Sequence, residues 1–108
     1  MSEKNTEVIN LLSQLNYQVD SIVSKILLKK DNGNVTLFAF DKGQGLTEHT
    51  SPYDALVHCL EGEIAIKVSE NNFIVSKGEL LKLPAAIPHA LSAKQKAKMI
   101  LTMIKSSS

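Results

Sequence analysis

The sequence predicts an all-β fold, either a barrel or a jelly roll built from short strands. Short apolar segments recur along most of the chain, and residues typical of turns (glycine, proline, asparagine and aspartate) separate them. The length of 108 residues, with 44% hydrophobic and 21% charged residues, is that of one ordinary globular domain. We therefore expect an arm over residues 1–16, a barrel domain over residues 17–105 and a disordered tail over residues 106–108.

The first residues of the chain favour a short amphipathic helix or an irregular arm. In residues 5–15 the apolar side chains recur at helical spacing, at Val8, Leu11, Leu12 and Leu15. From Tyr17 onward the spacing changes to that of strands. Residues 21–30 and 35–41 are expected to pair as a β-hairpin, because the segment Asp31-Asn32-Gly33-Asn34 between them is a strong turn.

The second strand of this hairpin is apolar on both faces. Its side chains are Val35, Leu37 and Ala39 on one side and Phe38 and Phe40 on the other. A strand with one solvated face in an antiparallel sheet should instead alternate apolar and polar residues. Residues 99–104 show the same two-faced pattern near the C-terminus. Both strands predict a second buried surface. The first indicates a sandwich-like barrel or a subunit interface, and residues 99–104 favour a homodimer.

Six further strands are expected after the glycine-containing loop at residues 42–45. They are residues 55–60, 63–69, 73–76, 80–83, 89–93 and 98–104. The turns between them include Glu61-Gly62, Asn71-Asn72 and Lys77-Gly78. This succession of short strands and turns completes the prediction of an all-β barrel.

The composition argues against several classes of partner. The net charge of +1 offers no basic field to attract nucleic acid. No segment approaches the roughly 20 apolar residues that span a bilayer, and the N-terminal residues lack the apolar core of a signal peptide. The single cysteine, Cys59, cannot form an internal disulfide, which agrees with a reducing compartment. We expect a soluble cytoplasmic protein that binds neither nucleic acid nor membranes.

Gly43, His49 and Gly62 frame one segment, with five residues between the first two. This spacing resembles the first sequence motif of the cupin superfamily, in particular of its small RmlC-like conserved-barrel proteins, G-x5-H-x-H-x3–4-E-x6-G. Ser51 stands at the position of the second histidine, and Ala55 stands at the position of the glutamate.

A later segment resembles the second cupin motif, G-x5-P-x-G-x2-H-x3-N. Gly78, Pro84 and His89 match it, whereas Ala86 replaces the glycine and Ala93 replaces the asparagine. The resemblance spans residues 35–104. It implies that the all-β domain is a double-stranded β-helix, the jelly-roll barrel of the cupins.

The resemblance also implies a divalent metal ion held by three histidines and one glutamate on inward-facing strand positions. Two of these four positions keep a ligand, His49 and His89. Catalytic zinc usually takes three protein ligands, and non-haem iron usually takes two histidines and a carboxylate. We therefore expect iron, manganese, nickel or zinc to bind weakly if at all. Asp54 is a further candidate ligand, provided that irregular backbone at Pro52 turns its carboxylate inward.

Ser51, Gln44 and Tyr53 are candidate ligand-binding residues beside the two histidines. A few polar groups converging on an apolar cavity are what a small ligand needs. The third histidine, His58, should face away from Ala55, because an odd number of residues separates them along a strand. Cys59 shares the inward direction of Ala55 and is expected to be a buried, inert thiol.

Three functions stay open at this level. The first is a small single-domain cupin that binds a small polar or anionic molecule in the barrel through His49 and His89, with at most a weak two-histidine metal site. The second is a metal-dependent oxygenase, isomerase or lyase. The third is a structural or sensing dimer without chemistry, whose histidines are satisfied by partners in the core. The residues do not decide whether there is catalysis.

Overall fold

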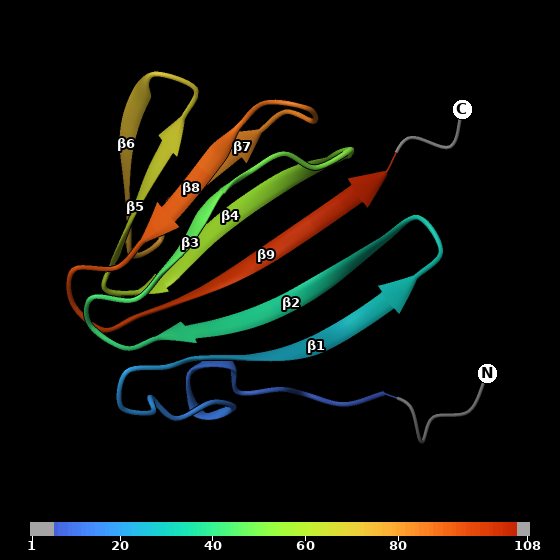
Figure 1. Cartoon of the computed structure of the whole chain (residues 1–108). Helices are drawn as coiled ribbons and strands as arrows, with labels where there is room; N and C mark the ends of the chain where they lie inside the picture. Colours follow the sequence, from blue (N-terminus) through green and yellow to red (C-terminus); the bar gives the residue numbers. More distant parts are fainter. Residues whose placement is uncertain (1–5, 106–108) are drawn as a thin grey trace.

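The chain folds into two antiparallel β-sheets that pack face to face, as the sequence predicts (Figure 1). The computed structural model describes residues 6–105. The first sheet contains, in order across it, β1 (Ile22–Lys30), β2 (Gly33–Phe40), β9 (Ala97–Lys105), β4 (Tyr53–Glu61) and β7 (Leu80–Leu83). The second contains β3 (Gly45–His49), β8 (His89–Ser92), β5 (Glu63–Val68) and β6 (Asn71–Ser76). Crossovers between the sheets make this a jelly-roll sandwich.

Most of the predicted strands are present, and two local predictions are wrong. The hairpin of β1 and β2 forms as expected. The strand Gly45–His49 was not predicted, because four of its five residues are exposed and it lacks an apolar alternation. Asn71 and Asn72, predicted as a turn, belong to β6. The turn lies just before them, where Ser69 adopts a left-handed φ of 54°.

The N-terminal segment is an irregular arm in the part that the structure describes. Its regular structure is one 3₁₀ turn, η2 (Leu11–Ser13), which the side chain of Asn10 caps by accepting from the amide of Ser13. Among residues 6–105, no helix is long and apolar enough to cross a membrane. The predictions for residues 1–5 of the arm and for the tail at residues 106–108 lie outside the described residues.

The core lies between the two sheets. Its buried side chains come from alternate positions of strands in both sheets: Phe40, Val57, Cys59, Ile64, Ile66, Val75, Leu91, Ala93, Ala97 and Met99. Burial raises the pKa of the Cys59 thiol, since the thiolate would lose its hydration. The prediction of a buried thiol is confirmed, and the raised pKa agrees with an inert one.

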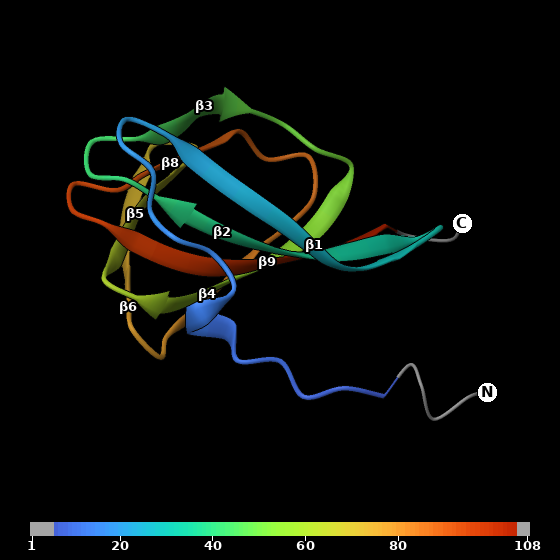
Figure 2. The same cartoon turned by 90° about the horizontal axis from the view of Figure 1, so that it is seen from below.

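The arm crosses the outer face of the five-stranded sheet (Figure 2). Lys98 points to this face, because its neighbours Ala97 and Met99 point into the core. The Lys98 ammonium donates a hydrogen bond of 2.6 Å to the carbonyl oxygen of Leu12 in η2. At the edge of the sheet, Lys25 of β1 donates from its ammonium to the side-chain oxygen of Gln14. These two lysines hold the arm against β9 and β1.

Tyr17 fixes the end of the same arm to β4. Its hydroxyl donates to the carboxylate of Glu61, and burial together with this hydrogen bond raises the pKa of the phenol. The ammonium groups of Lys98 and Lys96 lie 4.9 Å and 5.5 Å from the centroid of the Tyr17 ring. Lys98 therefore contacts the arm twice, through a backbone carbonyl and through an aromatic ring.

Ala86, in the loop between β7 and β8, holds a backbone conformation that favours glycine. Its φ is 65°, in the left-handed region where a Cβ atom crowds the following carbonyl. The amide of Ala86 nevertheless donates a hydrogen bond of 2.8 Å to the carbonyl oxygen of Ser51. This bond joins the loop before β8 to the loop before β4. It explains why the strained conformation persists.

Replacing Ala86 with glycine should stabilise the protein. Removing the Cβ relieves about 1 to 2 kcal/mol of strain, and the added freedom of the unfolded chain offsets about 0.4 to 1 kcal/mol of that gain. We expect a higher midpoint of thermal unfolding. The control is Ala85→Gly at a neighbour that has no positive φ, where only the entropic loss applies and the midpoint should fall. Equal decreases in both variants would contradict the strain at Ala86.

Replacing Lys98 with methionine should release the arm while leaving the barrel folded. Methionine keeps the apolar length of the side chain but cannot donate to Leu12. Amide hydrogen exchange at Ser13 and Gln14, whose amides donate hydrogen bonds within the arm, should become roughly tenfold faster, while exchange in β4 and β9 stays slow. Lys96→Met is the matched control, because exposed Lys96 also lies over the ring of Tyr17, whereas the hydrogen bond to Leu12 comes from Lys98. Unchanged exchange in Lys98→Met would show that the arm is held by other contacts.

Candidate functional site

The pairing of β3 with β8 brings His49 opposite His89. Gly45 begins β3 and allows the two strands to approach closely, because a Cβ at this position would lie 2.5 Å from the carbonyl oxygen of Leu91. The two imidazole rings pack edge to face, with their centroids 4.3 Å apart and their planes at 62°. One small group can therefore contact both rings.

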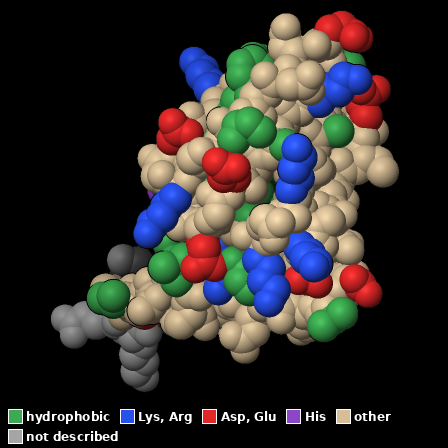
Figure 3. All heavy atoms as spheres, turned by 90° about the vertical axis from the view of Figure 1, so that its left-hand side faces the viewer, with side chains coloured by type: hydrophobic (Ala, Val, Ile, Leu, Met, Phe, Trp, Pro, Cys, Tyr) green, Lys and Arg blue, Asp and Glu red, His purple; other side chains and the backbone are tan. Residues whose placement is uncertain are grey.

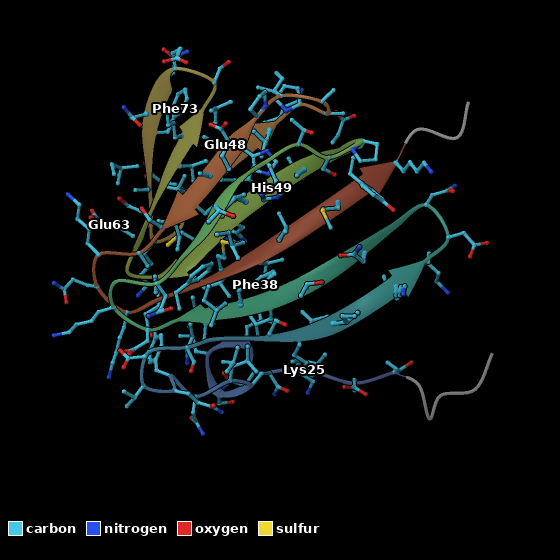
Figure 4. The ribbon with its side chains drawn as sticks, viewed as in Figure 1. Lys25, Phe38, Glu48, His49, Glu63 and Phe73 are labelled. Carbon is cyan, nitrogen blue, oxygen red and sulfur yellow. The ribbon has the colours of Figure 1, made fainter. Side chains whose placement is uncertain are left out.

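An irregularity in β3 turns His49 into the barrel. Leu46 pairs with Leu91 and the next pair is His49 with His89, so β3 has one residue more than β8 between these pairs. Strict alternation from inward-facing Leu46 would send Glu48 inward and His49 outward. The extra residue reverses this order: His49 lines the cavity, whereas Glu48 does not. Figure 4 labels both side chains on β3.

Both rings are oriented in the same way by the backbone. Nδ1 of His49 lies 2.8 Å from the carbonyl oxygen of Thr47, and Nδ1 of His89 lies 3.0 Å from that of Ile87. A carbonyl oxygen can only accept, so each Nδ1 must carry a proton and donate. In the neutral imidazole this leaves Nε2 as an acceptor with a free lone pair. The site thus presents two acceptor nitrogens.

A small cavity lies beneath the two rings. Its volume is about 40 Å³, enough for one or a few water-sized groups. The polar lining consists of His49, Ser51, Tyr53 and His89. Ala55, Met103 and other apolar side chains from both sheets form the rest of the wall. His49 is exposed and His89 half-buried, so the rings stand at the mouth of the cavity.

Four of the predicted site residues meet at this cavity, and two do not. Gln44 precedes β3 at the end opposite His49, where its backbone bonds to Ala93, and it does not line the cavity. Asp54 faces the outside of the five-stranded sheet, opposite Ile104, and accepts a hydrogen bond of 2.9 Å from the amide of Ala85. The predictions of Gln44 as a ligand contact and of Asp54 as a metal ligand are therefore corrected: regular alternation along β4 holds Asp54 outward.

The residues at the family positions of the missing ligands do lie in the cavity. Ser51 and Ala55 both line it, and the Ser51 hydroxyl oxygen accepts from the amide of Tyr53 at 3.1 Å. His58 points to the outer face opposite Ile100, as predicted. Sequence reasoning missed Met103, which follows the inward parity of buried Met99 along β9 and could have been found from it.

These donors do not fit the four-ligand metal site that the cupin motifs imply. In the described residues, no group of three or more histidine, cysteine, aspartate or glutamate side chains is placed to hold a metal ion. Ser51 is a weak neutral ligand and Ala55 has no donor atom. The two imidazoles remain oriented as metal-ligating histidines usually are, each donating its other ring nitrogen to a backbone carbonyl.

Comparison with known proteins finds the same fold and the same family. A crystal structure of the conserved protein SPY1581 of unknown function from Streptococcus pyogenes has a TM-score of 0.90 and 32% identity, over 96% of this chain and 91% of that one. A cupin 2 conserved barrel domain protein from Leptotrichia buccalis has a TM-score of 0.86 and 44% identity, over 90% of this chain. The match covers 47% of the Leptotrichia chain, so this chain spans about half its length.

A more distant structure supports the fold alone. An RmlC-like cupin protein from Desulfovibrio desulfuricans has a TM-score of 0.80 at 22% identity, over 93% of this chain and 97% of that one. No curated protein sequence is detectably similar. The model of the cupin domain matches residues 36–105, which include both histidines of the cavity and eight of the nine strands in whole or in part. The chain belongs to the cupin family.

Proposed function

We propose that this protein binds a small polar molecule at the mouth of the barrel, with His49 and His89 as the residues that recognise it. The observation that carries the proposal is the common orientation of the two rings, whose Nδ1 atoms are engaged by the carbonyl oxygens of Thr47 and Ile87. Their Nε2 atoms are left as neighbouring acceptors. Two acceptors favour a ligand that donates hydrogen bonds, such as a hydroxyl or an amine.

An anionic ligand is the less favoured form of this proposal. Neutral imidazoles held in this tautomer offer an anion no donor from Nε2, so an anion would depend on the hydroxyl of Ser51 alone or would need at least one ring to be protonated. The face of the molecule seen in Figure 3 offers no cationic patch as a substitute. On the face seen in Figure 3, lysine and acidic side chains are interspersed and do not gather by sign. A neutral or cationic donor suits the site better at neutral pH.

The volume of the cavity limits what can enter it. About 40 Å³ admits a hydroxyl, an amine or a methyl group but not a whole metabolite. Most of a larger ligand would stay outside, beside exposed His49 and half-buried Tyr53. The hydroxyl of Ser51 adds a donor at the polar end, and Ala55 leaves apolar space below it. This division favours a ligand with a polar end and a short apolar substituent.

Neither alternative function is favoured by a comparable observation. A metal-dependent enzyme lacks a third protein ligand near His49 and His89 among residues 6–105, so any metal held there would be weakly bound. A purely structural role would place both imidazoles within the core, whereas His49 is exposed. The cytoplasmic location and the exclusion of nucleic acid and membranes as partners stay predictions from the sequence.

Histidine substitutions test the proposed ligand site. Chemical shifts of the histidine ring protons should be followed by NMR while ethanolamine, as a donor probe, or acetate, as an anion probe, is titrated at neutral pH. Ethanolamine should perturb His49 and His89 and not His58. His49→Ala and His89→Ala should each weaken ethanolamine binding about tenfold or more, the loss of about 1.4 kcal/mol or more.

His58→Ala is the matched control, since this third histidine faces the outside of the sheet. Binding should be unchanged in this variant. Ethanolamine affinity that survives both cavity substitutions would refute His49 and His89 as the recognition residues. Acetate bound more tightly than ethanolamine at neutral pH would refute the preference for a donor.

Restoring the two missing ligands should create a metal site. Ser51 and Ala55 line the same cavity as the two histidines, so Ser51→His with Ala55→Glu would supply four donors. We expect Mn²⁺ or Zn²⁺ affinity, measured by titration calorimetry, to rise roughly a hundredfold over the unmodified protein. The control is Ser51→His with Leu56→Glu, because Leu56 alternates with Ala55 and faces outward. Equal metal affinity in the two double variants would show that a glutamate at residue 55 does not reach a metal ion held by His49 and His89.

A further inference from the structure

The inner face of the five-stranded sheet continues past the cavity toward the turn between β1 and β2. Across this face, Ala55 of β4 pairs with Met103 of β9, and Met103 pairs with Asn34 of β2. Asn34 pairs in turn with Lys29 of β1. Residues paired directly across antiparallel strands point to the same face, and both Ala55 and Met103 line the cavity. Asn34 and Lys29 therefore stand on the inner side, in one row with the cavity wall.

An irregularity in β1 turns Lys29 to this side. Lys25 faces outward, where its ammonium binds the arm. Ile26 and Leu28 pair with consecutive residues of β2, so the residue between them has no partner. Strict alternation from Lys25 would send Lys29 outward, and the extra residue reverses this. An irregularity of the same kind in β3 turns His49 into the barrel.

A polar hollow of about 440 Å³ lies over this end of the row. Its lining consists of Lys29, Lys30, Asp31, Gly33, Asn34 and Tyr53. Tyr53 also lines the cavity beneath the two histidine rings, so the hollow and the cavity share one wall. The turn between β1 and β2 lies at the same end of the molecule as the loop between β3 and β4 (Figures 1 and 2). A ligand at the mouth of the barrel can therefore extend into the hollow.

The side chains of the hollow are suited to an anion with a single charge. The Thr36 hydroxyl donates a hydrogen bond of 3.1 Å to the side-chain oxygen of Asn34, which leaves the NH₂ group of Asn34 as a donor. The ammonium of Lys29 adds a charged donor beside it. Lys29 and Lys30 contribute +2 and Asp31 contributes −1, so the lining has a formal charge of +1. This charge matches a carboxylate better than a doubly charged phosphate.

We propose that the ligand bound at the cavity carries a carboxylate at its far end, and that Lys29 and Asn34 bind this carboxylate in the hollow. The inference rests on the proposed function, because the donor group held by His49 and His89 directs the rest of the ligand past Tyr53. The ligand is then a short aliphatic acid with a hydroxyl or an amine at the end opposite its carboxylate.

The separation of the two binding regions keeps the carboxylate away from the histidines. Lys29 lies two strands from Met103 of the cavity wall, about 10 Å at the usual spacing of strands. A carboxylate in the hollow therefore does not meet the acceptor Nε2 atoms of the imidazoles, which would repel it. An acid with its amine and carboxylate on one carbon is too short to occupy both regions.

Two probes of equal length test this carboxylate site. Aminohexanoate and aminohexanol each carry an amine, but only the first has a carboxylate at its other end. The two should be titrated at neutral pH while the histidine ring protons are followed by NMR. Both should perturb His49 and His89, and aminohexanoate should bind about tenfold more tightly. Lys29→Met and Asn34→Asp should each remove this advantage; aspartate keeps an acceptor for Thr36 but replaces the NH₂ donor with a negative charge.

Lys67→Met is the matched control and should keep the advantage. Lys67 is an exposed lysine that alternates with the buried residues of β5, so it faces the outside of the other sheet. Equal affinity for two probes that both perturb His49 and His89 would overturn the carboxylate site but not the proposed function. Probes that perturb neither histidine would overturn both. An advantage that survives Lys29→Met and Asn34→Asp, or that is lost equally in Lys67→Met, would also overturn the carboxylate site.

Discussion

One apolar cluster holds the two sheets together, and the cavity begins where that cluster ends. Along the inner side of β4, the side chains run from buried Cys59 and Val57 to Ala55 and then to Tyr53 at the mouth. The first two fill the space between the sheets, whereas the small side chain of Ala55 leaves part of it open. The cavity is therefore a continuation of the core, lined by side chains of both sheets.

The chemistry of the site depends on backbone atoms as much as on the histidines. The irregular segment of β3 directs His49 inward and also supplies Thr47, whose carbonyl oxygen holds the ring. The loop before β8 supplies the corresponding carbonyl from Ile87. Both rings keep the orientation of metal ligands, yet Ala55 contributes no donor. This chain therefore keeps the ring orientation of metal-binding histidines but lacks the number of ligands that a metal site needs.

The sequence predicted the architecture, and four of the six candidate site residues line the cavity. Alternation along β4 places His58 outward and Ala55 inward as expected, because that strand is regular up to Cys59, and the same regularity keeps the candidate ligand Asp54 outside the cavity. The same reasoning fails for β3, where strict alternation would exclude His49 from the barrel. An extra residue in a short, exposed strand leaves no mark in the hydrophobic pattern. The family motif predicted the inward histidine there without predicting the irregularity that makes it possible.

The hydrophobic pattern of the sequence could not predict the volume of the cavity or the position of Gln44, for a different reason. Gln44 was predicted as a ligand contact because a small ligand needs a few polar groups that converge on an apolar cavity. The strand that separates Gln44 from His49 is extended, so a few residues carry Gln44 to the far end of β3. Similarly, no property of Ser51 or Ala55 reveals that the space beneath the rings is about 40 Å³, since that volume is set by side chains of both sheets.

The two-faced strands give the most instructive comparison. Apolar residues on both sides of β2 and β9 predicted a second buried surface, and the arm provides one over Leu37 while Ile104 remains exposed. A pattern along one strand cannot distinguish these two ends, because the covering segment is distant in sequence. The open end is the one that backs onto the cavity: Ile104 adjoins Met103 and Leu56 adjoins Ala55.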